Sequence, residues 1–354
     1  MNSVRPCSIL TASLLLAAAC HPAPPALWPT LAKESQSSGT SALLQAVSAV
    51  SNDVVWVSGQ RGTWARTLDG GRTWQTGSIP GGETLQFRDV HAANADTAWL
   101  LSSGSGDASR IYRTTDGGAT WSLQFRNTEP EAFYDCMDFW DARHGLVFGD
   151  AVNGRVMVLE TTDGEHWSLI PASRLPPALA GEGGFAASGT CLVTAPGGRA
   201  WIGTGNGPVS RVMRTTDYGK TWAVSKTPIA SAAATGVATV AFADARYGVV
   251  LGGPIADTAA VTDNVAITTN GGKTWDSAGR PTFPGPVFGA AFLPGTRTLV
   301  AVGLRGASVS PDGGHHWAAL DSVNYWGLGF SPGGAGWLVG PRGRITKLRI
   351  QVGQ

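Results

Sequence analysis

One short motif recurs six times along the chain and limits the folds that the chain can adopt. Each copy has an Asp or Asn two residues after a Thr or Ser, then at least one glycine, and ends on a tryptophan. The copies are TLDGGRTW (67–74), TTDGGATW (114–121), TTDGEHW (161–167), TTDYGKTW (215–222), TTNGGKTW (268–275) and SPDGGHHW (310–317). Successive copies are 42 to 54 residues apart, and a period near this length is typical of one four-stranded blade of a β-propeller.

The residues of this motif suit a tight turn better than a catalytic site. An Asp or Asn at the head of a turn accepts hydrogen bonds from backbone N–H groups just downstream, and glycine supplies the positive φ without steric cost. The trailing tryptophan can bury its ring against a neighbouring sheet while its N–H finds an acceptor. One copy has Asn, which keeps the acceptor and loses the charge, so we expect structural roles for Asp69 and Trp74, Asp116 and Trp121, Asp163 and Trp167, Asp217 and Trp222, Asn270 and Trp275, and Asp312 and Trp317.

Seven apolar strand-like segments accompany the six motifs. They are 54–62, 97–104, 144–150, 199–205, 247–253, 297–303 and 335–343. Glycine makes up 48 of 354 residues and charged residues only 14%, a composition that suits many short strands and tight turns. The sequence therefore predicts an all-β fold, a seven-bladed β-propeller of four-stranded antiparallel blades over residues 41–349, followed by a tail at 350–354.

The seventh blade lacks a motif after its strands, so its fourth strand has to come from elsewhere. Residues 26–31 (ALWPTL) resemble the strands that begin with the motif tryptophans. Closing the ring with this N-terminal strand would remove the free sheet edges. The alternative is a last blade of only three strands.

The N-terminus reads as an export signal. Residues 1–20 have one cation at Arg5, an apolar stretch over 9–19, and small residues up to Cys20, and the stretch is too short to span a bilayer. The run LAAAC resembles a bacterial lipobox, which implies lipidation of Cys20 after cleavage; ordinary cleavage is the alternative. We expect residues 21–40 to be a tether and the protein to be exported to the periplasm or outer envelope.

The remaining cysteines and histidines suggest no metal centre. Cys136 and Cys191 could form one disulfide in an exported protein or remain two buried thiols. The six histidines have no metal-ligand spacing, so neither a metal nor a cofactor is expected. The net charge of +1 removes the electrostatic case for a nucleic acid, and leaves the lipid as the only link to a membrane.

The repeated motif resembles the Asp box, or bacterial neuraminidase repeat. Residues 57–74, 302–317 and 339–348 are similar to propellers of the photosystem II stability and assembly factor type, and the resemblance covers about 41–349. It implies the fold. It leaves function open, because Asp boxes occur in sialidases and in non-catalytic scaffolds alike.

Three functional classes were weighed. A sialidase-like glycoside hydrolase needs an arginine cluster, a Tyr nucleophile and an acid/base carboxylate, and the nearest match to its Arg-Ile-Pro segment, at 173–176, lies between blades three and four. An oxidoreductase is less favoured still, because the glycine cluster at 203–207 opens no helix. We expect a non-catalytic scaffold that binds another envelope protein or a small polar ligand.

The first strand of each blade lines the channel of a propeller, so equivalent positions form rings. Alignment on Phe139, Phe242, Phe292 and Phe330 gives one level with Gln45, Arg88, Asp135, Thr190, Ala238, Phe288 and Trp326, and a second with Ser48, His91, Asp138, Val193, Ala241, Ala291 and Gly329. The candidate channel-mouth residues are Gln45, Arg88, His91, Tyr134, Asp135, Asp138, Tyr325 and Trp326. The alternative is that Arg88 and Asp135 merely pair with each other across the channel. An alignment error of one residue would turn every side chain to the other sheet face.

Overall fold

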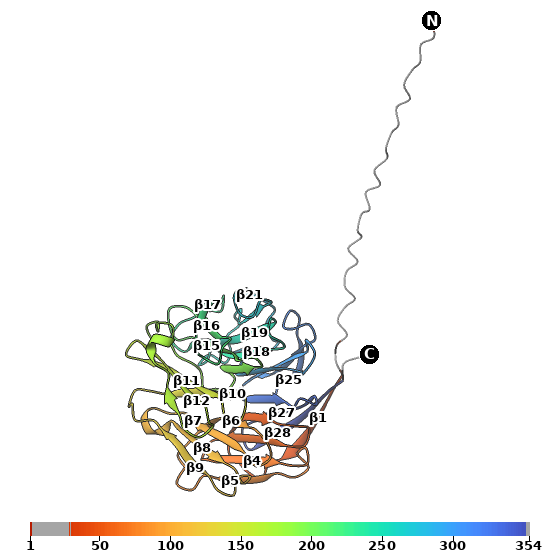
Figure 1. Cartoon of the computed structure of the whole chain (residues 1–354). Coiled ribbons are helices and arrows are strands. Elements are labelled where there is room, and N and C mark those ends of the chain that lie inside the picture. The colour runs from red at the N-terminus through yellow and green to blue at the C-terminus, as the bar shows by residue number, and fades with distance from the viewer. Residues whose placement is uncertain (2–27, 29, 352–354) are drawn as a thin grey trace.

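Seven four-stranded antiparallel sheets form a ring, and the chain passes through them in order (Figure 1). The computed structural model describes Met1, Trp28 and residues 30–351. Within this part the helical structure is limited to two 3-10 turns, η1 (Gly106–Ala108) and η2 (Ala172–Arg174). The all-β, seven-bladed prediction is confirmed.

Each of the first six blades takes its four strands consecutively from the chain. Blades 1 to 3 contain β2 (Leu44–Ala49), β3 (Val55–Gly59), β4 (Thr63–Thr67) and β5 (Gln75–Ser78); β6 (Phe87–Ala92), β7 (Ala98–Ser102), β8 (Arg110–Thr114) and β9 (Ser122–Arg126); and β10 (Tyr134–Phe139), β11 (Gly145–Val152), β12 (Arg155–Thr161) and β13 (Ser168–Leu169). Blades 4 to 6 contain β14 (Leu192–Ala195), β15 (Arg199–Thr204), β16 (Arg211–Thr215) and β17 (Ala223–Lys226); β18 (Thr235–Phe242), β19 (Gly248–Pro254), β20 (Val265–Thr268) and β21 (Asp276–Ser277); and β22 (Gly289–Phe292), β23 (Leu299–Gly303), β24 (Gly306–Ser310) and β25 (Ala318–Asp321).

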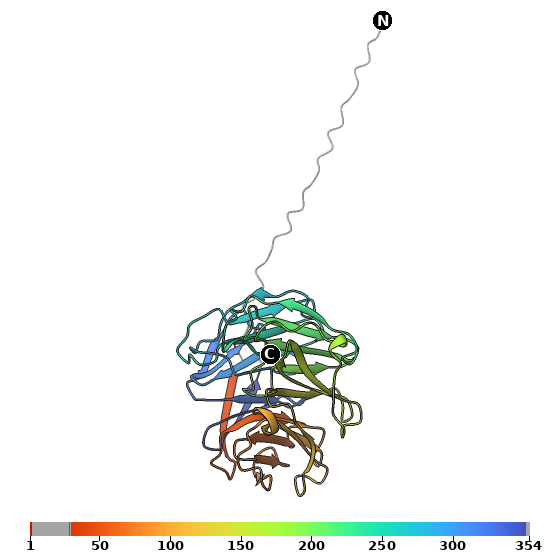
Figure 2. The same ribbon diagram turned by 90° about the vertical axis from the view of Figure 1, so that its left-hand side faces the viewer.

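The seventh blade joins the two ends of the described chain. Its order is β26 (Gly327–Phe330), β27 (Ala335–Gly340), β28 (Arg344–Gln351) and β1 (Thr30–Ser37). Figure 2 shows the red β1 among the blue C-terminal strands. The closing strand begins at Thr30, later than the expected 26–31, and residues 26, 27 and 29 of that segment lie outside the described residues. A three-stranded last blade is ruled out.

Side chains of β1 also connect the seventh blade to the blades on either side of it. Gln36 donates its amide to the carbonyl of Gly70 at 3.1 Å and accepts the indole N–H of Trp74 at 3.3 Å. Lys33 pairs with Asp321 of blade 6 at 2.8 Å. The N-terminal strand therefore contacts both adjacent blades.

The Asp boxes lock the turn between the third and fourth strands. In the first box, Thr67 Oγ1 donates to Asp69 at 2.8 Å and accepts the N–H of Gly71 at 2.8 Å. Asp69 also accepts the N–H and the hydroxyl of Thr73, at 2.9 and 2.7 Å. The same acceptor role falls to Asp116, Asp163, Asp217, Asn270 and Asp312.

The third and fifth boxes keep this geometry with different groups. In the shortened third box the ring of His166 takes the place of the threonine hydroxyl, 2.7 Å from Asp163. In the fifth box Asn270 donates its amide to Thr274 at 2.8 Å, because it has an N–H₂ where the others have a carboxylate oxygen. Charge is therefore not required for the turn.

Tryptophans connect adjacent blades in two layers. Those of the second strands, Trp56, Trp99, Trp201 and Trp337, are fully buried. The Trp99 indole donates to the carbonyl of Gly164 in the next blade at 2.9 Å. The box tryptophans are mostly half-buried and reach the preceding blade; Trp167, for example, donates to Gln124 at 3.3 Å. The prediction that box tryptophans hold blades together describes only the outer of these layers.

Candidate functional site

The central channel is lined by the first strand of each blade, and the ladder registers show which residues share a level. Ser48, His91, Val193 and Gly329 are opposite the four buried tryptophans of the second strands. Asp138, Ala241 and Ala291 occupy the equivalent positions of the other blades. These seven residues therefore form one level, and six of them line a cavity of about 290 Å³.

His91 and Asp138, a polar pair on this level, link three blades. His91 Nδ1 lies 3.0 Å from Asp138 Oδ1. Asp138 Oδ2 accepts the N–H and the hydroxyl of Thr194, at 2.7 and 3.0 Å. The His91 ring also packs on Phe139 with ring centroids 4.7 Å apart. Both oxygens of Asp138 are thus engaged within the ring.

The other level coincides with a β-bulge. In blades 1, 2, 3 and 5 the first strand has one extra residue against the second, at Gln45, Arg88, Asp135 and Ala238. A bulge re-aims a side chain and is common near sites. Gln45 is fully buried, and neither atom of its side-chain amide has a hydrogen-bond partner.

A hollow of about 250 Å³ lies at this end of the channel. Arg88 and the carboxyls of Asp135 and Asp150 line it together with the rings of Phe288 and Trp326. The two rings meet edge to face with centroids 5.0 Å apart. Charged, acidic and aromatic groups from blades 2, 3, 6 and 7 therefore converge here.

Arg88 does not simply neutralise Asp135. Its guanidinium donates to the carbonyl of Ala186 at 3.1 Å and to the side chain of Gln86 at 2.9 Å. Its Nε, although buried, has no partner, and the same is true of Asp135 Oδ2. Among the described residues Arg88 therefore forms no direct ion pair with Asp135, which was the alternative; its guanidinium binds Ala186 and Gln86 instead.

Burial favours the protonated forms of Asp135 and Asp150. Burial raises the pKa of Asp150 to about 6, even though the N–H of Gly184 donates to this carboxyl at 2.9 Å. Burial raises the pKa of Asp135 well above its usual value, and the nearby Asp150 carboxyl raises it further. Two buried carboxyls in contact cannot both ionise at neutral pH without a large cost.

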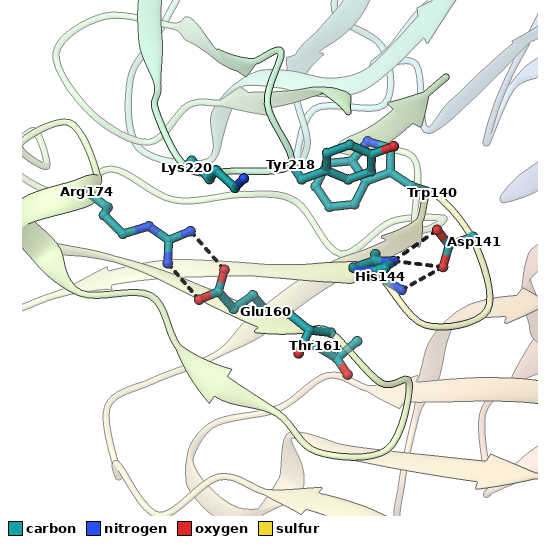
Figure 3. Close-up of a pocket in the computed structure, with 10 residues that line it drawn as sticks. Trp140, Asp141, His144, Glu160, Thr161, Arg174, Tyr218 and Lys220 are labelled. Carbon is teal, nitrogen blue, oxygen red and sulfur yellow. Dashed lines mark hydrogen bonds and ion pairs between the residues drawn. The ribbon is translucent and has the colours of Figure 1, made fainter. Parts of the chain in front are cut away.

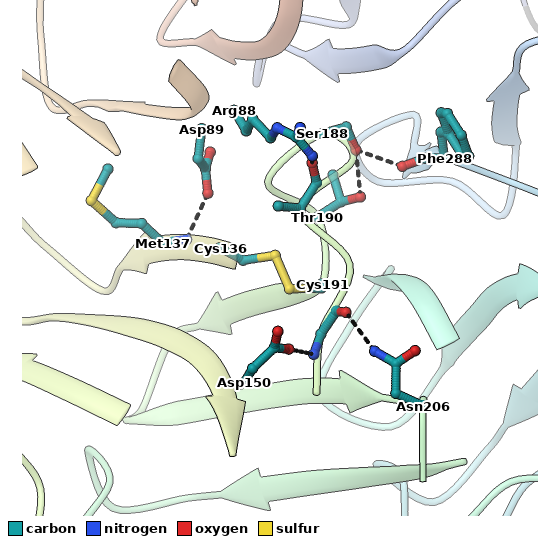
Figure 4. Close-up of a disulfide and its surroundings, with 12 residues drawn as sticks. Arg88, Asp89, Cys136, Met137, Asp150, Ser188, Thr190, Cys191, Asn206 and Phe288 are labelled. Atoms are coloured by element: carbon teal, nitrogen blue, oxygen red, sulfur yellow. Dashed lines mark hydrogen bonds between the residues drawn. A yellow bond between two sulfur atoms is a disulfide. The ribbon is translucent and has the colours of Figure 1, made fainter. Parts of the chain in front are cut away.

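A long connection between blades 3 and 4 crosses the channel at this end (Figure 4). Its residues Ser188, Gly189 and Thr190 line the channel cavity. The hydroxyl of Ser188 donates to the carbonyl of Phe288 at 2.6 Å. Gly189 has φ +79°, and a Cβ there would lie 2.1 Å from the Asp89 carboxylate, so only glycine fits this crossing. The segment therefore separates the hollow from the channel cavity.

Buried polar and covalent links hold the crossing segment. Glu182 forms a two-pronged ion pair with Arg211, whose Nη2 lies 2.6 Å from Oε2. The hydroxyl of Thr204 donates to the same carboxylate at 2.8 Å. At the end of the segment, Cys191 is joined to Cys136 of β10 by a disulfide, with Cα atoms 5.9 Å apart.

Two of the candidate residues do not reach the channel. Tyr134 and Tyr325 are each 2% exposed and lie in apolar clusters between blades. Burial raises the pKa of the Tyr134 hydroxyl to about 12, and the Tyr325 hydroxyl donates to Thr346 at 3.3 Å. Tyr134 directly precedes the bulge residue Asp135, and adjacent residues of a strand face opposite sides of the sheet.

Sequence reasoning did not identify Asp150 or Asp89. Asp150 ends the segment GLVFGD (145–150), where a lone acid after apolar and small residues gave a usable signal. Asp89 is buried and accepts the N–H groups of Val90 and Met137 at 2.7 and 2.6 Å, and burial raises its pKa to about 8. Among residues 30–351 there is no group of three or more His, Cys, Asp or Glu side chains that could hold a metal ion.

Comparisons with known proteins agree with this architecture. Residues 112–123, around the second box, match the BNR/Asp-box repeat family. No curated protein matches the sequence.

Solved structures share the fold at low identity. YCF48 bound to a D1 peptide is similar with a TM-score of 0.64 and 17% identity, over 91% of this chain and 97% of that one. YCF48 from Cyanidioschyzon merolae gives 0.61 and 17%, over 90% and 99%. A GH74 xyloglucanase from Xanthomonas campestris gives 0.60 and 15%, over 90% of this chain and 53% of the enzyme.

Proposed function

We propose that the protein is a non-catalytic scaffold that binds a segment of a partner protein at the hollow around Arg88. The observation that carries the proposal is the convergence of Arg88, Asp135 and Asp150 with two aromatic rings around one hollow. A concave site with apolar walls and a few convergent polar groups is the usual form of a binding site. Its volume of about 250 Å³ suits one side chain of a partner, with the rest of the partner lying on the surrounding loops.

A protein of similar fold supports this use of a propeller. The structure of YCF48 holds a D1 peptide, so a ring of this kind can serve as a peptide receptor.

The geometry is unfavourable for a glycoside hydrolase. Retaining and inverting enzymes need one of their two carboxyls ionised beside the sugar, whereas Asp135 is buried and burial raises its pKa well above the usual value. Neither Tyr134 nor Tyr325 presents its hydroxyl at the hollow, so a tyrosine nucleophile is also missing from the candidates. A fluorogenic sialoside should remain uncleaved; turnover that is lost in Asp135→Asn would reverse this conclusion.

Partner capture by Arg88→Ala protein tests the binding proposal. Immobilised wild-type protein should recover a partner from envelope extracts, and Arg88→Ala should lose it without a lower melting temperature. Arg126→Ala is the matched control, since Arg126 is exposed on the outer strand β9. Lowered melting with intact recovery would make Arg88 a structural residue.

We also propose that the protein is exported and anchored by a lipid on Cys20, a residue outside the described part of the chain. A disulfide between Cys136 and Cys191 suits an oxidising compartment. Residues 30–351 contain no helix with the length and apolar character needed to cross a membrane. Palmitate labelling should be lost in Cys20→Ser, and an unlabelled, wholly soluble wild type would argue for simple secretion.

A further inference from the structure

A third and larger cavity lies between blades 3 and 4, away from the channel mouth (Figure 3). Its volume is about 650 Å³, within the usual range for ligand sites. Trp140 and Asp141, which line it, directly follow β10, whereas Asp135 of the channel mouth is near the start of that strand. The two sites therefore lie at opposite ends of one strand, and this inference is independent of the proposed function.

A strained tyrosine forms part of the wall. Tyr218 has φ +60°, at a box position where Gly70, Gly117, Gly271 and Gly313 have φ between +72° and +79°. A bulky residue in this conformation is disfavoured and is found where the side chain has a use. The Tyr218 side chain is 44% exposed, so its burial does not explain why the strain is kept.

The neighbouring backbone is shaped around this ring. Gly198 has φ +73°, and a Cβ there would lie 2.6 Å from Tyr218 Cδ2. The carbonyl of Gly198 accepts the N–H of Tyr218 at 2.9 Å. The turn therefore fixes the place of the tyrosine as well as tolerating it.

Two further rings stand beside Tyr218. Trp140 meets it with centroids 5.1 Å apart, and His144 with centroids 5.8 Å apart. The Trp140 indole is held by a hydrogen bond to the carbonyl of Arg199. Together the three side chains give the cavity a firm apolar wall.

The rest of the lining is polar and includes one cation without a counter-ion. Arg174 forms a two-pronged pair with Glu160 at 2.7 and 2.9 Å, and His144 lies 3.0 Å from Asp141. Lys220 has no acidic partner among the residues that the structure describes. In the view of Figure 3, Lys220 lies between the Arg174–Glu160 pair and the rings.

We infer that this cavity binds a saccharide that carries a carboxylate. A sugar ring has C–H groups on its face, which suit the aromatic wall, and hydroxyls at its edge, which suit paired Asp, Glu, Arg and His side chains. The unpaired ammonium of Lys220 favours an acidic ring over a neutral one. A peptide would need backbone N–H and carbonyl groups to pair with its own amides, whereas the polar groups described in this lining belong to side chains.

Calorimetric titration with trigalacturonate, and with maltotriose as its neutral counterpart, tests the assignment. Trigalacturonate should bind more tightly than maltotriose. Tyr218→Gly introduces the residue that most of the other boxes have at this position, and glycine adopts a positive φ without strain. The melting temperature of this variant should therefore stay within a few degrees of wild type. Its affinity for trigalacturonate should fall about tenfold or more, as expected for loss of an aromatic contact, whereas Tyr218→Phe should keep the affinity.

The matched control is Val224→Ala, which removes a similarly exposed apolar side chain from β17 of the same blade. It should bind trigalacturonate like wild type, and Lys220→Gln should lose the preference for the acidic sugar. Failure of trigalacturonate to bind, or equal binding by Tyr218→Gly and wild type, would overturn the inference. Tyr218-dependent binding of an oligoglutamate peptide in place of the sugar would overturn the saccharide assignment.

Discussion

Carboxylates have opposite properties at two places in this molecule, and their hydrogen bonds and burial explain the difference. The hydroxyl and then the N–H of Thr120 lower the pKa of Asp116 to about 2. Burial instead raises the pKa of Asp150 to about 6. The box acids are therefore charged turn-formers, whereas the acids of the channel mouth hold a proton close to neutral pH.

Asp150→Asn should flatten the pH dependence of stability. The folded state keeps the Asp150 proton up to about pH 6, while the unfolded chain releases it near 3.8. The wild-type free energy of unfolding should therefore fall as pH rises from about 4 to 6, by about 1 kcal/mol per pH unit for one proton. Asn keeps an acceptor for Gly184 and an N–H₂ for Asp135, so the variant should lose the Asp150 share of this slope and exceed wild type at pH 8. Asp89 and Asp135, whose pKa values burial also raises, account for the slope that remains.

Urea unfolding at pH 4.5, 6 and 8 measures this difference. Asp276→Asn, at an exposed position of β21, is the control and should keep the wild-type slope. An Asp150→Asn slope equal to that of wild type would mean that the pair holds no proton in this range.

At the scale of elements, short-range patterns were predictable and long-range contacts were not. The boxes and the second-strand segments carry their own turn and strand signals, and so the blade order follows from them. The position of β1 was harder to predict from the sequence, because its residues TLAKESQS are mostly exposed and show little apolar periodicity. The channel crossing depends on Glu182 and Arg211, 29 residues apart, whose pairing has no periodic signature.

Removal of β1 should destabilise the ring. Its eight residues pair with β28 from Thr30–Gln351 to Ser37–Arg344. Loss of these bonds and of the half-buried Leu31 should cost about 2 kcal/mol or more, and would leave an open edge prone to association. A chain starting at residue 38 should unfold at lower denaturant and scatter more light than a chain starting at Trp28. Equal stability of the two chains would show that three strands suffice for the last blade.

The disulfide should contribute substantially to stability. Cys136 and Cys191 are 55 residues apart, and a closed loop of this size corresponds to about 4 kcal/mol in the chain-entropy account. The double variant Cys136→Ala, Cys191→Ala should lose a large part of this amount in denaturant unfolding. Reduced wild type should match it, and equal stability of the oxidised and reduced proteins would contradict the expectation.

At the scale of the whole molecule, the ring brings residues from distant blades to one end of the channel. The alignment of first strands placed Arg88, Asp135 and Trp326 on one level, and all three line the hollow. The bulge at this level, which occurs in only four blades, was not predicted. It could not predict that the segment before Cys191 crosses the channel, since a connection follows no repeat. Nor did it indicate which face of the sheet Tyr134 would take next to a bulge.

The central claim is that a partner protein binds at the hollow around Arg88, and photo-crosslinking from within the hollow tests it most directly. A benzophenone amino acid in place of Trp326, which is half-buried beside Phe288, is irradiated in intact cells. One discrete protein adduct should form, should be absent when the probe replaces the exposed Leu123 of β9, and should disappear with Arg88→Ala. An adduct that persists in Arg88→Ala, or the absence of any adduct at position 326 in folded protein, would contradict the account.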